Sequence, residues 1–481
     1  MQNHRAVVVI GAGISGLVCA YRLKTLGIDV LLIEKSNRVG GVIQSERVDG
    51  FLIERGPNSS QGTEELMTLV EELGLIGDLA EGNPKAPAYV FFNGSLHRVP
   101  SGPGAFLTSS LLSALGKLAI FKEPFVAARR EGAEESVAAF ARRRLGAQAA
   151  ERLVAPFVSG IYAGDAEKLS VQAAFPKLAN LETAYGGLIR GMFAKARQAG
   201  DKNKSSPQSS AKAPTRRRLV SFSEGMSFLP RKLAEHLGED LVTGCSNIQV
   251  GSAPDDGSPS ETKPSPYRTG AGLASPAFDV EVDRGSSERI TCEQLVVATP
   301  ARAAGELVAV FSPELGDLLD RIEYAPLAIL CLSYASSSIS VPLDGFGFLV
   351  APSEGLNILG CVWNSSLFSG RAPAGMALLT VFVGGARNPA VARLADAELV
   401  STAHSELQRA LGISSEPRVV AITRYERSIP QYNLGHAERV KRIESLLDTI
   451  PGLNIIGNYL HGVSTGDCIK EADRVAREIA R

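Results

Sequence analysis

The stretch VVVIGAGISGL at residues 7–17 determines the expected fold of this chain. Three glycines, Gly11, Gly13 and Gly16, lie between an apolar run and the start of a helical pattern. The first permits a tight turn, the second lets backbone approach a pyrophosphate, and the third lets helix and strand pack closely. Glu34 ends the next apolar run and supplies the carboxylate expected about 20 residues further on to bind ribose hydroxyls. The chain therefore begins with a predicted β-α-β unit that binds a dinucleotide.

Composition and charge exclude several classes of protein. The chain has 481 residues, of which 44% are hydrophobic and 21% charged, enough for two or three domains with buried cores. Fifty basic and fifty-one acidic residues give a formal charge of -1, so no overall field favours nucleic acid. The longest apolar region, residues 100–128, is broken by charged residues, glycines and prolines, and falls short of the about 20 apolar residues that a membrane span needs. We expect a protein that neither binds nucleic acid nor crosses a membrane.

Cysteine usage and the N-terminus indicate the compartment. The six cysteines form no C-x-x-C pair, and a chain of this size does not need disulfides to fold. The first residues run directly into a predicted strand without the apolar core of a signal peptide. These features predict a reducing, cytoplasmic setting.

The rest of the chain divides into segments of different character. Residues 84–195 hold short apolar helices with basic clusters, whereas alternating apolar segments at 327–384 predict an antiparallel sheet. A strand ending at Ile456 and a helix starting near Thr465 are expected to rejoin the N-terminal sheet. The expected class is α/β and α+β: a Rossmann-like domain, an antiparallel substrate domain and a helical lobe. The predicted boundaries are 1–83, 219–301 and 426–481 for the nucleotide domain, 84–200 for the lobe, 302–425 for the substrate domain, and 201–218 and 251–277 for two low-complexity surface loops.

The residues after Glu34 distinguish a flavin from a nicotinamide. The chain continues KSNRVGGVIQS at residues 35–45, so the pair Gly40-Gly41 follows the acid. This extended pattern resembles the FAD-binding signature of the amine oxidase and phytoene desaturase superfamily, in which Arg38 and the glycine pair lie along the pyrophosphate. A nicotinamide dehydrogenase would not be expected to continue in this way.

Further motifs resemble one branch of that superfamily, the oxygen-dependent porphyrinogen oxidases of haem synthesis. The resemblance covers nearly the whole chain except the two low-complexity loops. The motifs are FLIERGPNSSQG (51–62), PFVSGIYAGDAEKLSVQAAFPKL (156–178), FSEGMSFLPRKL (222–233), GFGFLV (345–350), FVGGARN (382–388) and GNYLHGVSTGDCI (457–469).

The resemblance implies a flavoenzyme in which FAD carries the chemistry. Three two-electron oxidations, each a hydride transfer to flavin N5, would convert protoporphyrinogen IX to protoporphyrin IX, with dioxygen as acceptor and hydrogen peroxide as product. No catalytic side chain and no metal are implied.

The resemblance also implies which residues hold the cofactor. They belong to the glycine turn, the segment after the second strand, the GPNS motif, two single positions and the C-terminal motif. They are Gly11, Ala12, Gly13, Ile14, Ser15, Gly16, Glu34, Lys35, Arg38, Gly40, Gly41, Val42, Gly56, Pro57, Asn58, Ser59, Ile248, Thr299, Gly457, Val463, Ser464 and Thr465.

For the substrate, the resemblance implies an apolar cavity that sandwiches the macrocycle. Leu349, Val362 and Phe382 take the lining positions, and Gly160 lies where the ring passes close to backbone. Many relatives carry an arginine at the position of Ala88 to pair with a substrate propionate. The alanine leaves that contact unassigned, and the nearby Arg98 is a candidate for it.

The C-terminal motif has two interpretations. Histidine, aspartate and cysteine within eight positions are the residue types of a thiol nucleophile with its base and orienting acid. The alternative, which we favour, is a cofactor cap: backbone of Val463, Ser464 and Thr465 faces the flavin, and Cys468 is a buried packing group.

Several alternatives stay open at this point. Coproporphyrinogen III could be the substrate, and an amine oxidase, a carotenoid desaturase or a flavin-free binding protein of the same fold would share the first motif. The helical lobe corresponds to the part of the relatives that touches the membrane surface, so peripheral membrane contact is expected at most. A homodimer and hand-off of the product to a chelatase are also left open.

Overall fold

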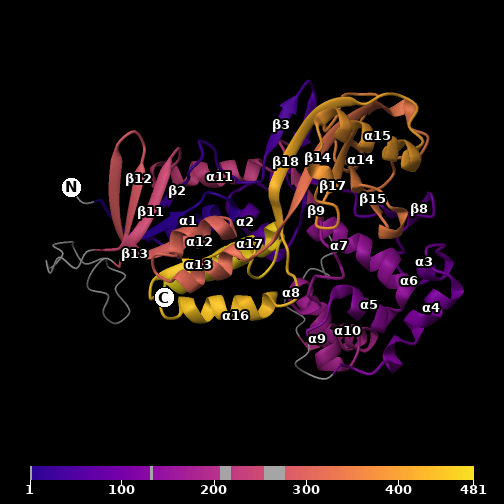
Figure 1. The fold of residues 1–481 in the computed structure, drawn as a ribbon, viewed down its shortest axis with the longest axis horizontal. Coiled ribbons are helices and arrows are strands. Elements are labelled where there is room, and N and C mark those ends of the chain that lie inside the picture. Colours follow the sequence, from indigo (N-terminus) through magenta and orange to yellow (C-terminus); the bar gives the residue numbers. More distant parts are fainter. Residues whose placement is uncertain (1–2, 130–133, 206–217, 254–276) are drawn as a thin grey trace.

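The computed structural model describes residues 3–129, 134–205, 218–253 and 277–481, and it is built around two large sheets and a helical lobe (Figure 1). The first sheet has the order β10-β2-β1-β13-β12-β11, with β19 also paired to β13. Its strands are β1 (Asn3–Ile10), β2 (Val30–Ile33), β10 (Leu241–Val242), β11 (Asn247–Ser252), β12 (Phe278–Asp283), β13 (Ser287–Val297) and β19 (Leu453–Ile455). Strands β10, β2, β1, β13 and β19 are mutually parallel, as the predicted β-α-β unit requires.

Both faces of the first sheet are covered, which explains the continuous apolar run in β1. Val7 and Val9 belong to one core, and Val8 and Ile10 belong to the other, because successive side chains of a strand point to opposite faces. The first core is closed by α1 (Ile14–Thr25), α2 (Glu64–Glu72), α11 (Phe228–Leu237) and α17 (Thr465–Ile479). The second is closed by α12 (Ala301–Val308), α13 (Pro313–Asp320) and α16 (His436–Leu447).

The second sheet has the order β18-β14-β17-β16-β15-β7-β8 and is antiparallel except for the β15–β7 pair. Its strands are β7 (Ala88–Phe92), β8 (Ser95–Arg98), β14 (Tyr324–Ala335), β15 (Gly347–Val350), β16 (Ile358–Trp363), β17 (Met376–Gly384) and β18 (Arg418–Pro430). Helix α15 (Asp396–Leu411) packs on one face of it, and α14 (Asn364–Leu367) follows β16 directly. Smaller elements are the hairpin of β3 (Ser45–Val48) and β4 (Phe51–Glu54), and a three-stranded sheet of β5 (Ser60–Gln61), β9 (Leu219–Phe222) and β6 (Leu79–Glu81).

The helical lobe lies beside the second sheet (Figure 1). Its helices are α3 (Pro103–Thr108), α4 (Ala114–Phe121), α5 (Val137–Leu145), α6 (Ala147–Ala149), α7 (Ala155–Tyr162), α8 (Val171–Ala174), α9 (Pro176–Tyr185) and α10 (Leu188–Ser205), with a π-helical turn at Ala150–Val154 before α7. None of the helices in the described ranges is both long and apolar enough to cross a bilayer.

The predicted fold class is confirmed, but three boundaries differ from the expectation. Residues 88–98, predicted to belong to the helical lobe, form the β7–β8 hairpin at the edge of the second sheet. Residues 302–320, assigned to the substrate domain, are mostly helix (α12 and α13) packed on the first sheet, and β18 extends the second sheet to Pro430 rather than 425. Each segment has an apolar face, and only the tertiary structure decides which sheet that face covers.

The two predicted low-complexity loops, 201–218 and 251–277, lie mostly outside the described residues. Within the described part, α10 continues to Ser205, so the first five residues of the 201–218 segment are helical and not loop.

A buried ion pair connects the first sheet's accessory hairpin to the second sheet. Glu54, the last residue of β4, binds Arg371, which precedes β17, at 2.8 Å, and both side chains are almost fully buried. The Glu54 carboxylate also accepts hydrogen bonds from the Ser45 hydroxyl and the Met226 N–H. Burial outweighs these partners and raises the pKa of Glu54 to about 6. The pair holds the segment after β4 against the second sheet.

Candidate functional site

The candidate site lies at one edge of the first sheet. Strands β1, β2, β13 and β19 are parallel, so their carboxyl ends, Ile10, Ile33, Val297 and Ile455, meet at the same edge. Ligands of open α/β sheets bind outside this edge. The loops that follow these four strands carry most of the predicted cofactor residues.

The glycine turn after β1 has the geometry that its sequence predicts. A β-carbon on Gly16 would lie 1.9 Å from the carbonyl oxygen of Gly11, and one on Gly11 would lie 2.9 Å from that of Ala298. Gly11 also has a φ of +104°, which other residues rarely adopt. A β-carbon on Gly13, by contrast, would meet nothing within 4 Å. The outer glycines are needed for packing, and the middle one leaves the backbone open to a ligand.

Helix α1 begins at this turn with an uncapped N-terminus. Its N-cap is Gly13, which has no side chain to accept hydrogen bonds from the first-turn N–H groups at Ile14, Ser15 and Gly16. These groups carry partial positive charge and suit an anionic phosphate.

The second glycine pair lies against the first turn. Gly40 N–H donates to the Ala12 carbonyl at 2.8 Å, and a β-carbon on Gly41 would be 3.4 Å from Cα of Gly13. Arg38 is exposed and donates to the Gly41 carbonyl at 2.7 Å. The structure therefore brings Arg38 and the glycine pair to the turn that the resemblance associates with pyrophosphate.

Glu34 follows β2 and is held at the same edge. One carboxylate oxygen accepts the Ala12 N–H at 2.7 Å, and the other accepts the N–H and the hydroxyl of Ser36, each at 2.8 Å. Cys245 N–H donates to the Glu34 carbonyl at 3.1 Å, which places the start of β11, with Ile248, near this residue. Lys35 is exposed beside them.

Thr299 follows β13 and lies against the glycine turn. Its methyl carbon would be 3.1 Å from a β-carbon on Gly11. Its hydroxyl oxygen is buried and has no hydrogen-bond partner among the described residues. A buried hydroxyl without a partner is costly in a protein interior, and a polar ligand bound at the adjacent glycine turn would be a partner for this one.

The GPNS motif connects this edge to the second sheet. A β-carbon on Gly56 would be 2.0 Å from the Val42 carbonyl, so the motif lies directly on the segment after the glycine pair. Asn58 is buried, and its side-chain oxygen accepts a hydrogen bond at 2.5 Å from Asn364 on α14. Pro57 and Ser59 are half-buried beside it. The sequence did not single out Asn364; its place directly after β16 in LGCVWN was the available signal.

The C-terminal loop after β19 ends in a capped helix. The Ser464 hydroxyl accepts the Asp467 N–H, and the Asp467 carboxylate accepts the Ser464 N–H, so the two residues form a capping box at the start of α17. This confirms the predicted helix start at Thr465 and the place of Asp467 in its first turn. A β-carbon on Gly457 would lie 2.4 Å from the ring of Tyr459, and Val463 packs against the core of the helical lobe.

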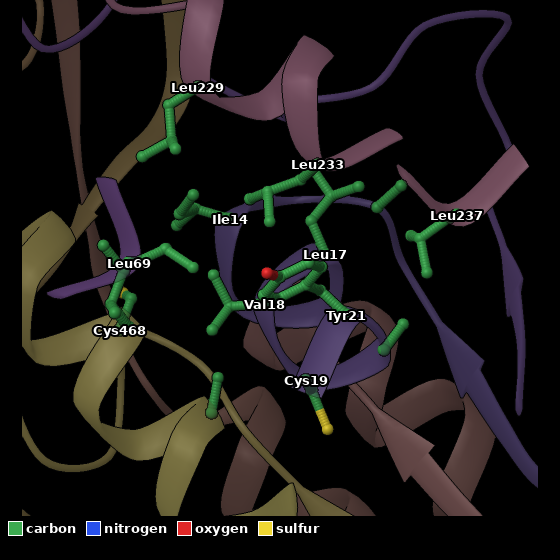
Figure 2. Packing of buried hydrophobic residues seen from close by; sticks show 14 of the residues in the cluster. Ile14, Leu17, Val18, Cys19, Tyr21, Leu69, Leu229, Leu233, Leu237 and Cys468 are labelled. Atoms are coloured by element: carbon green, nitrogen blue, oxygen red, sulfur yellow. The ribbon is translucent and has the colours of Figure 1, made fainter. Parts of the chain in front are cut away.

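Cys468 has the environment of a packing group. It lies in the core around α1, where Figure 2 shows it on the side of Leu69. Burial raises the pKa of its thiol to about 11, even with Ser15 as a hydrogen-bonding neighbour. His461 instead pairs with Glu444 at 3.2 Å and is exposed. The predicted burial of Cys468 is confirmed, and His461 does not form a base for the thiol.

These observations fit a bound dinucleotide. The edge offers open backbone at Gly13 and an uncapped helix start, and the unpartnered Thr299 hydroxyl lies next to the same glycine turn. The predicted ribose acid and glycine pair lie in the adjacent loops. The donors and the open backbone match a phosphate-bearing ligand better than a protein partner.

The predicted substrate residues share one face of the second sheet. Residues paired across strands point to the same face, and the register pairs Leu349 with Gly360 and Gly360 with Phe382. Val362 pairs with Gly347, which in turn pairs with Ala88. Leu349, Val362 and Phe382 are half-buried, whereas the residues of the opposite face are buried beneath α15. The four strands thus present an apolar surface away from α15; we call Ala88, Leu349, Gly360, Val362 and Phe382 the open face.

Helix α7 lies against the open face and carries Gly160. The helix contacts β15 and β16, and a β-carbon on Gly160 would be 2.6 Å from a methyl group of Leu349. Gly160 itself is exposed. The predicted backbone approach at Gly160 is therefore beside the predicted lining residue Leu349.

Arg98 is the predicted substrate residue that the structure does not bring to this face. It pairs with Tyr89, and Tyr89 pairs with Phe348, which is in the core beneath α15. Since paired residues share a face, Arg98 lies on the side opposite Ala88. The sequence placed it by nearness along the chain, and the strand register reverses its direction.

Comparison with known proteins gives a consistent result. The family model described as "Flavin containing amine oxidoreductase" matches residues 14–480. The chain is 34% identical to protoporphyrinogen oxidase, chloroplastic, of Oryza sativa subsp. japonica over 98% of this chain and 88% of that protein. It is 29% identical to coproporphyrinogen III oxidase of Bacillus subtilis over 98% of this chain and 97% of that protein.

Solved structures share the fold. The crystal structure of a candidate protoporphyrinogen oxidase from Exiguobacterium sp. 255-15 superposes with a TM-score of 0.77 at 24% identity, covering 100% of this chain and 99% of that one. A putrescine oxidase variant superposes with a TM-score of 0.67 at 17% identity, covering 100% and 99%. At these identities the structures show a common fold.

Proposed function

The chain belongs to the flavin containing amine oxidoreductase family, and we propose that it binds FAD and oxidises protoporphyrinogen IX to protoporphyrin IX in haem synthesis. The observation that carries the proposal is the open face: the apolar residues that the porphyrinogen oxidase motifs predicted fall on one surface of one sheet. Full-length relatives named for the oxidation of porphyrinogens support it.

When bound, the flavin supplies a two-electron acceptor that can pass its electrons to dioxygen. The overall reaction balances with three dioxygen molecules, which take the six electrons and six hydrogens of one porphyrinogen and leave as three molecules of hydrogen peroxide. The glycine turn, Glu34 and Thr299 would hold the dinucleotide part, and the backbone of Val463, Ser464 and Thr465 would lie at the ring.

The chain's own contribution to the reaction is to bind, orient and exclude water. Leu349, Val362 and Phe382 offer an apolar surface for the macrocycle. Cys331, on the same face of the neighbouring strand, stays a neutral thiol because burial raises its pKa to about 11. Each two-electron oxidation removes one hydride and one proton from the substrate. The chain orients the weak C–H bond for hydride transfer, and we assign the release of the proton to no side chain.

Charge favours protoporphyrinogen over coproporphyrinogen. Protoporphyrinogen carries two carboxylates, and coproporphyrinogen III carries four. The open face has alanine at position 88, and Arg98 lies on the opposite side of the sheet. The alanine at position 88 provides one cation fewer than an arginine there would, although Arg152 lies over the ring of Phe92 on the same strand; the missing cation suits the substrate with fewer carboxylates. Coproporphyrinogen III remains the second candidate substrate, because this chain matches a relative named coproporphyrinogen III oxidase over almost the full length of that relative.

The helical lobe supports peripheral contact with a membrane. A group of large apolar side chains on α3, α4, α7, α10 and the turn after α4 is exposed, which is unusual for a surface without a partner. They are Leu107, Leu115, Leu118, Phe121, Phe125, Phe157, Ile161, Met192 and Phe193. Ile161 directly follows Gly160 in α7, the helix that contacts β15 and β16 of the open face. We propose that this surface rests on a bilayer and receives the apolar substrate there.

A vesicle experiment tests the membrane contact. Wild-type protein should cosediment with phospholipid vesicles, and the double variant Leu115→Ser, Phe125→Ser should remain in the supernatant with its porphyrinogen turnover in detergent retained. Equal sedimentation of both proteins would refute the contact. A cytoplasmic setting, a homodimer and hand-off to a chelatase stay predictions.

The proposed reaction is tested with purified protein reconstituted with FAD. Incubation with protoporphyrinogen IX in air should form fluorescent porphyrin and about three molecules of hydrogen peroxide per porphyrin, as the electron balance requires. Protein that stays colourless after incubation with FAD would instead support a flavin-free binding protein of the same fold.

A further inference from the structure

We propose that Tyr432 is a positioning residue for the flavin: its hydroxyl fixes the loop of residues 457–464, here called the cap loop, and its ring joins that loop to the helix that carries Gly160. The inference rests on the proposed function, because the cap loop holds predicted flavin contacts. No motif in the sequence pointed to Tyr432.

The hydroxyl of Tyr432 closes the cap loop on itself. It donates a hydrogen bond to the Asn458 carbonyl at 2.7 Å and accepts one from the Gly462 N–H at 2.9 Å. The Asn458 carbonyl and the Gly462 N–H are four residues apart in the sequence. One buried oxygen therefore sets the distance between Asn458, near the start of the cap loop, and Gly462, one residue before Val463.

The backbone conformation of Gly462 is restricted by its surroundings. Its φ is +156°, and a β-carbon at this position would lie 2.5 Å from the carboxyl carbon of Asp467. The residue is thus pressed against the capping box of α17, and its N–H is directed at Tyr432. The hydroxyl of Tyr432, the loop and the start of α17 form one connected unit.

The ring of Tyr432 is held as firmly as its hydroxyl. The side chain is 1% exposed, and its ring stacks on His436 with centroids 4.1 Å apart and planes 12° apart. On another side it contacts the ring of Tyr162, 5.7 Å away. Packing on both sides fixes the direction of the hydroxyl, as a positioning group requires.

The contact with Tyr162 connects the cap loop to the substrate side. Tyr162 is the last residue of α7, two positions after Gly160. Its carbonyl accepts a hydrogen bond from Gln431, the neighbour of Tyr432, at 2.8 Å. A change in the place of α7 is therefore transmitted to Tyr432 by direct packing and a hydrogen bond. Tyr432 therefore contacts both the cap loop, which holds predicted flavin contacts, and α7, which carries the predicted substrate residue Gly160.

The test is a pair of matched substitutions. Tyr432→Phe keeps the ring stack and removes both hydrogen bonds, so the cap loop should become more mobile. Ordering this loop would then be part of the free-energy cost of binding FAD, and the affinity should fall. Tyr459→Phe is the control: Tyr459 lies in the same loop and is fully buried, but its hydroxyl has no hydrogen-bond partner among the described residues. We expect the Kd for FAD to rise about tenfold or more in Y432F and to stay within about twofold in Y459F.

Two measurements keep the outcome clear. If Y432F and Y459F bind FAD equally well, or lose affinity equally, Tyr432 has no positioning role. Amide hydrogen exchange of the wild-type protein without FAD tests the same bond if Y432F does not fold. The Gly462 amide should then exchange slowly, and exchange as fast as that of an open loop would overturn the proposal. Failure of the proposed function would look different, since wild-type protein would then not bind FAD or not oxidise a porphyrinogen.

Discussion

Gly160 on α7 and Leu349 on β15 are in such close contact that a single methyl group added to Gly160 would lie 2.6 Å from Cδ2 of Leu349. Two segments almost 190 residues apart in the chain meet at this point. One of them belongs to the helical lobe and the other to the open face of the second sheet. This contact joins the helical lobe to the predicted substrate site.

The first prediction concerns Gly160. In Gly160→Ala the new methyl group pushes Leu349 into the space for the macrocycle, so kcat/KM for the porphyrinogen should fall about tenfold or more, which corresponds to about 1.4 kcal/mol, while FAD binding is unchanged. Gly104→Ala is the control, because it gives an exposed helix the same gain in helix propensity and its β-carbon would meet nothing within 4 Å. Adding Leu349→Ala to Gly160→Ala should restore part of the activity. No change in the steady-state kinetics of Gly160→Ala would show that the substrate lies elsewhere.

Ala88 gives the second prediction. Ala88→Arg places a guanidinium at the exposed edge of the open face, beside Gly347. It should lower the KM for coproporphyrinogen III more than that for protoporphyrinogen IX, because the former carries two more carboxylates, and the effect should weaken in high salt. Arg98→Ala should leave both KM values unchanged, since Arg98 lies on the other face. A large rise in KM for Arg98→Ala would contradict the assigned face.

The third prediction separates a cofactor cap from a thiol nucleophile. Cys468 is buried in the core around α1 and its thiol pKa is about 11, so almost none of it is thiolate at neutral pH. Cys468→Ala should keep turnover within about twofold and lower the free energy of unfolding by about 1 kcal/mol through lost packing. Turnover and thermal unfolding of the FAD-loaded variant are measured together. Loss of turnover with flavin still bound would support the interpretation of Cys468 as a nucleophile.

The fourth prediction concerns His436, whose ring stacks on Tyr432. Burial, and then the nearby Arg439, lowers the pKa of His436 from 6.5 to about 4. A lowered pKa in the folded state means that stability is present above pH 6.5 and is lost as the pH falls toward 4, because unfolding releases a group that takes up a proton. The loss attributable to this group is about 3 kcal/mol at most.

The measurement compares wild type with His436→Phe, which keeps a flat ring against Tyr432 and cannot titrate. Denaturant unfolding between pH 7 and pH 4 should show that wild type loses more stability than the variant over this interval. Glu54, with its pKa raised to about 6, acts in the opposite direction in both proteins, so it cancels in the comparison. Parallel stability curves would contradict the assignment to His436.

Local patterns predicted the parts of the fold that local physics determines. The β-α-β unit could be predicted from the apolar strand and the spacing of Gly11, Gly13 and Gly16. Gly11 and Gly16 have neighbouring atoms that leave no room for a side chain, and Gly13 has open space beside it. The helix start at Thr465 was also predictable, because Ser464 and Asp467 have the spacing of a capping box.

The parts that failed depend on tertiary contacts or on an overlooked turn signal. The β7–β8 hairpin could have been found, because Asn93 and Gly94 both have positive φ and the Asn-Gly pair favours a tight hairpin turn. The direction of the Arg98 side chain depends on the strand register, and a shift of the register by one residue would turn it to the other face. The place of Asn364 and the role proposed for Tyr432 depend on partners about 300 and about 30 residues away in sequence.

The most direct test of the account is anaerobic mixing of FAD-loaded protein with a porphyrinogen while the flavin absorbance is followed. Protoporphyrinogen IX should bleach the flavin, and it should do so faster than coproporphyrinogen III at equal concentration. Admission of air should then restore the colour and leave fluorescent porphyrin. If the flavin keeps its absorbance with both porphyrinogens, the open face does not serve porphyrinogen oxidation and the central claim is wrong.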